Sequence, residues 1–272
     1  MVRVIGVGDN TVDRYLHLGK MFPGGNSLNV PVLAHRLGHP AAYLGWLAKD
    51  PHGLLVYNSI YEEGIDVSHC RLIEGENANC EVTLKDGDRV FGDYSEGVCD
   101  QIALNDEDLN FISTFDLVHT SVYSFIIPFL KQLRSLSKVL SYDFSQEWNG
   151  DSLAGTLPFV DIALISNPVE NIDENKELIN YASSFGPDII LVTSGEQGAL
   201  LYDGSQFYHQ PILPVEKVVD TLGVGDAFAT RFMVDYLGGL SVQVALQNAA
   251  KSAAETCMYY GAFGHGAPLY KK

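Results

Sequence analysis

The stretch Asp220-Thr-Leu-Gly-Val-Gly-Asp226 carries the residues best suited to chemistry in this 272-residue chain. Gly223 and Gly225 allow a tight turn that exposes backbone N–H groups, and an apolar-periodic segment at 226–237 predicts a helix directly after it. Exposed N–H groups at the positive end of a helix bind anions such as phosphate. Asp226 stands where a carboxylate can cap this helix, or can take a proton from a hydroxyl that attacks a phosphorus atom. Both roles are open at this point.

A second stretch, Gly24-Gly-Asn-Ser-Leu-Asn29, places polar side chains at the start of another predicted helix, which ends at Gly38. Asn26 and Asn29 are three residues apart and therefore share one face of its first turn. Their amides can cap the helix, or they can bind sugar hydroxyls as donors and acceptors together.

Strands and helices alternate along the chain and position these motifs. Strands are predicted at 2–7, 41–47, 117–120, 139–144, 162–166 and 189–193, and further helices at 53–64, 106–113, 125–137, 170–185 and 241–260. Such alternation predicts a parallel sheet with helices on both faces, whose ligands bind beyond the carboxyl ends of the strands. Polar residues fall at several of these ends: Asp143, Asn167, Glu170, Thr193-Ser-Gly195 and the stretch from Asp220 to Asp226.

Residues 79–94 form a predicted β-hairpin, because two alternating runs flank Asp86-Gly87. The returning arm is rich in polar groups: Arg89, Asp93, Tyr94 and Glu96. With a short strand at 15–18, the hairpin is expected to form a small sheet apart from the main one, a lid built from residues of about 10–18 and 79–98. A second hairpin is predicted from 199–202 and 206–209, with its turn at Asp203-Gly204.

Composition and charge narrow the class of protein. A hydrophobic fraction of 46% is ample for a full core, and 34 acidic against 17 basic residues give a formal charge of −17. Such acidity argues against nucleic-acid and anionic-membrane binding. The four cysteines have no paired spacing, and no signal peptide or membrane-spanning run is evident, so a reduced, cytoplasmic protein is expected.

Three motifs, in this order and spacing, resemble the PfkB/ribokinase family of carbohydrate kinases over nearly the whole chain: Gly24-Gly-x-x-x-Asn29, Thr193-x-Gly195-x-x-Gly198 and Asp220-Thr-x-Gly-x-Gly-Asp226. The resemblance implies a single α/β domain over residues 1–272. This domain would be a ribokinase-like three-layer α/β/α unit with a mostly parallel central sheet and a small β-sheet lid. It also implies ATP-dependent transfer of a phosphoryl group to a primary sugar hydroxyl.

A finer resemblance is to family members that phosphorylate fructosamines such as fructoselysine at C6. It rests on Gly8-Asp-Asn-Thr-Val-Asp13, Gly24-Gly-Asn-Ser-Leu-Asn29, Arg89-Val-Phe-Gly-Asp-Tyr-Ser-Glu-Gly97 and Tyr142-Asp-Phe-Ser145. Two alternatives stay open: another sugar or nucleoside kinase of the family, and a non-catalytic sugar or nucleotide sensor with the same fold.

The resemblance also assigns roles to residues. It makes Asp226 the general base and the N–H groups of Gly223, Val224, Gly225 and Asp226 the anion hole. Substrate binding is assigned to Asp9, Asp13, Gly24, Gly25, Asn26 and Asn29 and, in the hairpin, to Arg89, Asp93 and Tyr94. Nucleotide binding is assigned to Thr193, Gly195, Gly198, Thr221 and Asn248. Asn167 and Glu170 would support Mg²⁺ through water, although both can instead cap the helix that follows them.

The cofactors that the resemblance implies are ATP and Mg²⁺, with a monovalent cation as a further candidate, and the partners are a small sugar and a second copy of the chain bound through the lid. A fructosamine carries a secondary ammonium and an amino-acid end. Asp93 or Glu96 can pair with the ammonium, and Arg89 can pair with the carboxylate of the amino-acid end. Two residues depart from the family pattern. Val224 replaces the usual Ala, and Arg231 replaces a Gly five residues after the base; Arg231 can form a salt bridge, line the pocket or mark weakened activity.

Overall fold

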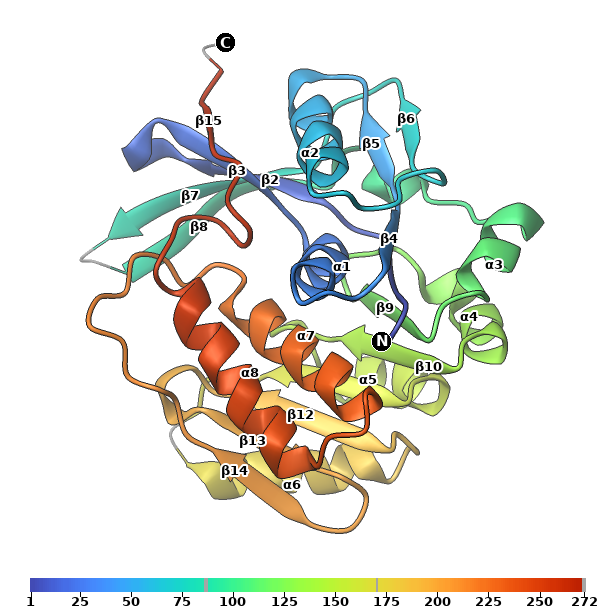
Figure 1. Ribbon diagram of the computed structural model, residues 1–272, viewed down its shortest axis with the longest axis vertical. Coiled ribbons are helices and arrows are strands. Elements are labelled where there is room, and N and C mark those ends of the chain that lie inside the picture. The colour runs from blue at the N-terminus through green and yellow to red at the C-terminus, as the bar shows by residue number, and fades with distance from the viewer. Residues whose placement is uncertain (86–87, 170, 271–272) are drawn as a thin grey trace.

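The computed structural model describes residues 1–85, 88–169 and 171–270, with the side chains of residues 84–91 also outside the description. Its main sheet has eight strands in the order β14-β13-β12-β11-β10-β9-β1-β4 (Figure 1). These are β1 (Val4–Val7), β4 (Ala41–Leu44), β9 (Leu117–Ser121), β10 (Val139–Asp143), β11 (Ile162–Ser166), β12 (Ile189–Thr193), β13 (Ala199–Tyr202) and β14 (Phe207–Gln210). All pairings from β4 to β12 are parallel, and the last two are antiparallel. The predicted parallel sheet is confirmed, and its nearly continuous apolar strands are those of a sheet covered on both faces.

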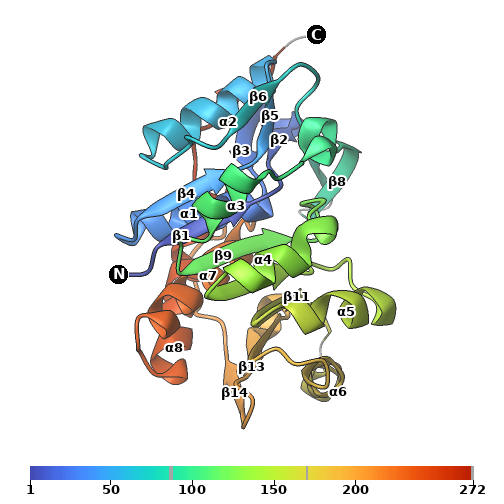
Figure 2. The ribbon, with the colours of Figure 1, turned by 90° about the vertical axis from the view of Figure 1, so that its right-hand side faces the viewer.

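Helices cover both faces of this sheet (Figure 2). One face packs against α1 (Asn26–Arg36), α7 (Val224–Leu237) and α8 (Val242–Thr256), which contribute Val30, Phe232 and Leu246 to its core. The other packs against α3 (Asp106–Ile112), α4 (Leu130–Leu136), α5 (Gly150–Thr156) and α6 (Ile172–Ser183), through residues such as Leu133 and Ile179. The three-layer prediction is therefore confirmed.

A second sheet has five strands in the order β15-β3-β2-β7-β8. They are β2 (Thr11–Tyr15), β3 (Lys20–Gly24), β7 (Asn79–Lys85), β8 (Asp88–Ser95) and β15 (Ala267–Pro268). The predicted hairpin is confirmed as β7 and β8, although its turn at Asp86-Gly87 lies outside the described residues.

The predicted strand at 15–18 is wrong. β2 ends at Tyr15, and Leu16–Leu18 is a 3-10 turn that reverses the chain so that β3 returns antiparallel to β2. The predicted lid segment 79–98 also ends too late, because a 3-10 helix begins at Gly97. β3 and β15 were not predicted.

The predicted strand at 41–47 divides at Gly45. β4 stays in the main sheet, whereas β5 (Trp46–Ala48) pairs with β6 (Arg71–Ile73) in a separate two-stranded sheet. α2 (Pro51–Glu62) follows, and the Asp50 side chain caps it by accepting from Gly53 N over 2.8 Å. The helix α2 lies beside the five-stranded sheet, which is the smaller of the two large sheets, and packs against its strands β2 and β3 (Figure 1).

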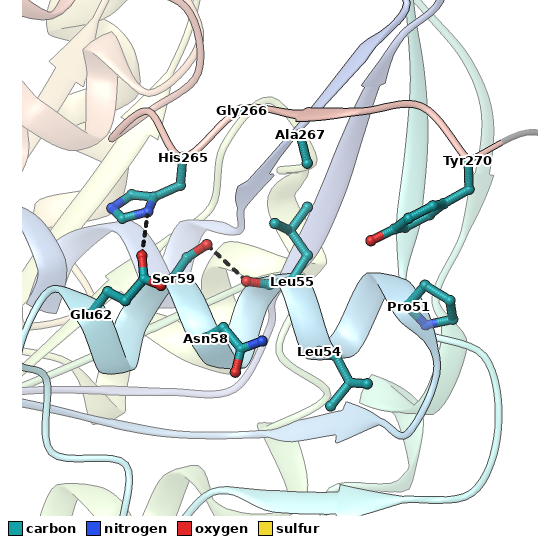
Figure 3. A pocket seen from close by; sticks show the side chains of 10 residues that line it. All are labelled: Pro51, Leu54, Leu55, Asn58, Ser59, Glu62, His265, Gly266, Ala267 and Tyr270. Carbon is teal, nitrogen blue, oxygen red and sulfur yellow. Dashed lines mark hydrogen bonds and ion pairs between the residues drawn. The ribbon is translucent and has the colours of Figure 1, made fainter.

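A hollow of about 540 Å³ lies between α2 and the C-terminal segment (Figure 3). Its wall includes Leu55, His265 and Tyr270, and none of the residues with a predicted site role lines it. His265 ties the C-terminal segment to the end of α2, because its Nε2 lies 2.6 Å from Glu63 Oε1. In residues 1–85, 88–169 and 171–270, no helix has both the length and the apolar character needed to cross a bilayer.

Candidate active site

Asp226 lies in the first turn of α7, where amides from α1 hold its carboxylate. Asn29 Nδ2 donates to Asp226 Oδ2 over 2.6 Å, and Asn26 Nδ2 donates to Oδ1 over 3.2 Å. The N-caps of α7 and α1 are Gly223 and Gly25, and neither helix has a side-chain cap among the described residues. Asp226, Asn26 and Asn29 therefore do not cap their helices, and their roles in catalysis and in sugar binding stay predictions.

Asp143 brings a second carboxyl group close to Asp226. It ends β10 and accepts from Asn26 Nδ2 over 2.9 Å and from the backbone N–H of Ser145 over 2.6 Å. The two hydrogens of the Asn26 amide thus join two acidic side chains, one from the sheet edge and one from α7. Asp143 was noted for its place at a strand end and within the motif Tyr142-Asp-Phe-Ser145, but it was not predicted as a site residue.

Burial and neighbouring negative charges shift the titration of this pair. Burial is the largest cause that raises the pKa of Asp226 to about 8, and the negative charge of Asp143 is the second. The hydrogen bond from Asn29 acts in the opposite direction and lowers this pKa. The charges of Asp9 and Asp13 act in the same direction. Burial likewise raises the pKa of Asp143 to about 6. A general base works best when its pKa lies near the operating pH, and Asp226 meets that condition.

Asp9 joins the ends of several elements. Its Oδ1 accepts from the backbone N–H of Ser27 over 3.1 Å and from the hydroxyls of Ser121 and Ser124 over 2.7 and 2.8 Å. These bonds fix the start of α1 against the end of β9. The two serines were not predicted; the available signal was a Ser-Val-Tyr-Ser segment directly after an apolar strand.

Gly24 leaves room beside two buried polar side chains. A Cβ added there would lie 2.9 Å from Asp13 Oδ2 and 3.9 Å from Asn29 Oδ1. Asp13 and Asn29 are only 5% and 4% exposed, and Asn29 Oδ1 has no hydrogen-bond partner among the described residues. Because an unpaired buried acceptor is costly, this edge of the site fits a ligand that donates hydroxyl hydrogens, as a sugar does.

The start of α7 fits an anion. Gly223 adopts a left-handed conformation with φ +71°, and a Cβ there would lie 2.4 Å from Ala262 Cβ, so only Gly fits this turn. The N–H groups of Gly225 and Asp226 have no acceptor among the described residues. A Cβ at Gly225 would meet nothing within 4 Å, so the space beside this residue is open. Free N–H groups at the start of a helix suit a phosphate.

The predicted nucleotide and metal residues meet at the ends of β11 and β12. Asn167 N–H donates to Thr193 O over 2.9 Å, and Asn167 Nδ2 donates to Asn175 Oδ1 over 2.8 Å. Asn175, which was not predicted, in turn donates a hydrogen bond from its Nδ2 to Ser194 Oγ over 2.7 Å. This arrangement leaves Asn167 Oδ1 as an oxygen of the kind that Mg²⁺ and its waters prefer. Glu170 lies outside the described residues.

Three further residues predicted to bind the nucleotide lie in loops that follow β12 or precede α7. Gly195 begins the 3-10 turn after β12 and Gly198 ends it, while Thr221 lies in the segment before α7. A Cβ at Gly198 would lie 2.2 Å from Gln210 O, so close packing against β14 explains this glycine whether or not it contacts a ligand.

Arg231 and Asn248 share one acceptor. Arg231 Nε donates to Asp235 Oδ2 over 2.8 Å, and Asn248 Nδ2 donates to the same oxygen over 2.7 Å. Of the three roles considered for Arg231, the structure places it in a salt bridge within α7 that also fixes α8. The assignment of Asn248 to nucleotide binding stays a prediction.

Asp93 and Tyr94 of the hairpin line one hollow together, at the end of β8. Asp93 lines a polar hollow of about 460 Å³ with Arg14, Glu81 and others, and the acidic residues around Asp226 take no part in that hollow. Tyr94 lies close enough to Asp9 that burial and that negative charge raise the pKa of its hydroxyl. The Arg89 side chain lies outside the described part of the chain.

The raised pKa of Asp226 predicts a pH-dependent effect of Asp226→Asn on stability. In the unfolded chain this carboxyl ionises near pH 4, but in the folded protein near pH 8, so the stability present below about pH 4 is lost as pH rises through 8. We expect the variant to be more stable than the wild type by an amount that grows from pH 5 to pH 8.5. At the upper end its free energy of unfolding should be higher by roughly 1–3 kcal/mol, and its melting temperature should rise accordingly. Calorimetry across this range measures it.

The exposed Asp106 in the first turn of α3 provides the control, since Asp106→Asn removes a carboxylate from water. A constant difference between Asp226→Asn and wild type from pH 5 to 8.5 would contradict the raised pKa.

Solved structures define the class of fold. Arabidopsis thaliana ribokinase complexed with ribose and ATP superposes with a TM-score of 0.80 at 22% identity, covering 96% of this chain and 93% of that one. A putative ribokinase II from E. coli in complex with ATP and Mg²⁺ gives a TM-score of 0.80 at 19% identity, covering 97% and 95%. The fold is therefore ribokinase-like.

Sequence comparison gives the family. Residues 2–138 and 163–265 match the pfkB family carbohydrate kinases. The chain is 40% identical over 271 residues to fructosamine kinase FrlD of Bacillus subtilis (strain 168), covering 98% of this chain and 95% of the relative. It is 35% identical over 258 residues to fructoselysine 6-kinase of Escherichia coli (strain K12), covering 94% and 98%. The chain belongs to the pfkB family and is a carbohydrate kinase.

Proposed function

We propose that this kinase transfers the γ-phosphoryl group of ATP to the C6 hydroxyl of a fructosamine such as fructoselysine. The proposal is supported by the relatives named fructosamine kinase and fructoselysine 6-kinase, which this chain matches over nearly its full length. The observation that carries the chemistry is the Asp226 carboxyl group, held by Asn26 and Asn29 beside the open N–H groups at the start of α7.

In the proposed reaction the C6 hydroxyl oxygen forms a bond to the γ-phosphorus while the bond from that phosphorus to the leaving oxygen of ADP breaks. The hydroxyl proton passes to the ionised form of Asp226. Because the pKa of Asp226 is raised to about 8, this form is a strong base, although it makes up only about a tenth of the molecules at pH 7. The N–H groups of Gly225 and Asp226 stabilise the negative charge of the transferring group, because they are fixed in place before the reaction begins. The Val224 N–H, which was also assigned to the anion hole, donates to Thr221 O over 3.4 Å.

Mg²⁺ would supply charge neutralisation at the phosphates when bound. Asn167 fits a role in holding its water shell, since Asn175 and Ser194 orient its amide. The contributions of Glu170 and of a monovalent cation stay predictions. Dimerisation through the smaller sheet also stays a prediction, which light scattering of the purified protein tests.

A substrate panel tests the proposed function. We expect ADP release with Mg-ATP on fructoselysine and other fructose-amino acids, at a kcat/KM at least about 100-fold above that on fructose or ribose, because polar groups that pair with the amino-acid end are left unpaired by a plain sugar. Phosphorus–proton NMR correlation of the product locates the new ester at C6.

Other outcomes would redirect the assignment. Turnover on plain sugars or nucleosides alone would keep the kinase and reject the fructosamine. Binding of sugar and ATP without turnover on any of these compounds would reject the kinase reaction and favour a sensor.

A further inference from the structure

His119 is a fully buried polar side chain in β9 that the reaction as described does not use. Its Nδ1 lies 2.9 Å from Ser141 Oγ on β10, and its Nε2 lies 2.9 Å from Asn26 Oδ1 on α1. Both ring nitrogens therefore have a partner, as buried polar groups require. The ring connects the middle of the main sheet to the amide that contacts Asp143 and Asp226.

The direction of each hydrogen bond follows from the groups at the far end. Asn26 Nδ2 donates to Asp143 Oδ2 and to Asp226 Oδ1, so both of its hydrogens are used and its Oδ1 must accept. His119 Nε2 therefore carries a hydrogen. Burial lowers the pKa of His119 to about 4, so the ring is neutral and its Nδ1 accepts from the Ser141 hydroxyl.

His119 Nε2 is the donor that the described structure provides for Asn26 Oδ1. With that donor present, rotation of the Asn26 amide by half a turn would place its oxygen against two carboxyl groups and its nitrogen against the His119 N–H. Both contacts are repulsive, so the donor fixes the orientation of the amide. Without it, the amide oxygen loses its partner and the side chain is free to leave the geometry that serves Asp226. The orientation of Asn26 thus depends on a residue in the sheet interior.

We propose that His119 is a positioning residue for phosphoryl transfer: its Nε2–H holds the Asn26 amide with both hydrogens toward Asp143 and Asp226, and so keeps the Asp226 carboxylate aligned. This inference rests on the proposed function, in which Asp226 is the general base. His119 itself touches no reacting atom.

The surroundings of Asp226 make this amide important for its titration. The groups that face Asp226, directly or through a neighbour, come from several elements: Asp143 on β10, Asp9 after β1, Asp13 on β2, Asn26 and Asn29 on α1, Tyr123 and Tyr142 beside Asp143, and Tyr94 beside Asp9. The neighbouring charges that act on Asp226 are all negative. The hydrogen bond from Asn29 lowers the pKa of Asp226 and so favours its ionised form. Asn26 donates to the other carboxylate oxygen and acts in the same direction, because a donor stabilises a carboxylate.

Two polar variants of His119 separate positioning from simple packing. His119→Gln places an amide N–H near the position of Nε2 and keeps a donor for Asn26. His119→Asn is shorter, so its amide reaches only the Ser141 side. We expect His119→Asn to lower kcat at pH 7 about tenfold and to move the acid limb of its pH profile upward by about one pH unit, with KM for ATP unchanged. We expect His119→Gln to stay within about threefold of wild type with no such movement.

Carboxyl-carbon NMR titration of Asp226 gives the same comparison without turnover. We expect the Asp226 pKa to rise in His119→Asn and to be unchanged in His119→Gln. Equal behaviour of the two variants, or a fall in kcat with an unmoved acid limb and an unmoved Asp226 titration, would overturn the positioning role. If the wild type phosphorylates nothing, the proposed function fails, and the NMR comparison still decides whether His119 orients Asn26 toward Asp226.

Discussion

Asp226→Asn is expected to lower kcat on the preferred sugar by about a thousandfold, while KM for ATP stays within a few-fold of wild type. The amide is nearly isosteric with the carboxylate, but it cannot accept the hydroxyl proton as the bond to phosphorus forms. The N–H groups at the start of α7 remain, so binding and part of the transition-state stabilisation persist. Steady-state ADP release at saturating sugar and ATP measures the effect.

This loss is not expected to reflect unfolding, because the same substitution relieves a buried carboxyl with a pKa raised to about 8 and thereby stabilises the fold above neutral pH. Asp106→Asn again serves as the matched control and should retain full activity. If Asp226→Asn kept a tenth or more of kcat, Asp226 would not be the base. Asp143, which shares the Asn26 amide, would then be the residue to test.

Much of the main sheet could be predicted because each strand carries its signal locally. Ile162–Ser166 and Ile189–Thr193 are apolar runs bounded by polar residues, and their observed bounds equal the predicted ones. The 41–47 run was predicted as a single strand because its apolar pattern is continuous. Its division depends on which neighbour each half pairs with, since β5 finds β6 some 25 residues later in the chain, and no local pattern encodes that choice.

The smaller sheet shows the same limit more strongly. β3 contains Pro23 and Gly24, which disfavour a strand in local terms, yet it pairs with β2 on one side and with β15 on the other. β15 is only two residues long and comes from the opposite end of the chain. Tertiary pairing, and not propensity, makes strands of both.

For the site, the sequence predicted the motif residues but not what connects them. Asn26 meets His119, Asp143 and Asp226 across separations of 93, 117 and 200 residues. The one local signal for His119 is a polar ring inside the apolar run Leu117-Val-His119, because a buried histidine needs partners at both nitrogens. Which partners it finds depends on how α1 packs over β9, and only the folded chain provides that.

Gly223→Ala is expected to have the second largest effect, because it acts on the fold and on the anion hole together. The new Cβ would lie 2.4 Å from Ala262 Cβ, and the residue would need a φ of +71°, which an L side chain disfavours. Strain and overpacking together predict a loss of about 2–5 kcal/mol in the free energy of unfolding. Any shift of the turn also moves the N–H groups of Gly225 and Asp226, so kcat should fall by roughly 100-fold even well below the melting temperature.

Gly239, at the other end of α7, allows the two causes to be separated. It also has a positive φ, +95°, but a Cβ there would meet nothing within 4 Å, so Gly239→Ala adds backbone strain without a clash. We expect a cost of about 1–2 kcal/mol and unchanged kcat for this variant. Equal stability losses at the two glycines would mean that contact with Ala262 does not constrain the turn. A destabilised Gly223→Ala with full kcat would mean that the turn holds the helix in place but that its N–H groups do not stabilise the transferring phosphoryl group.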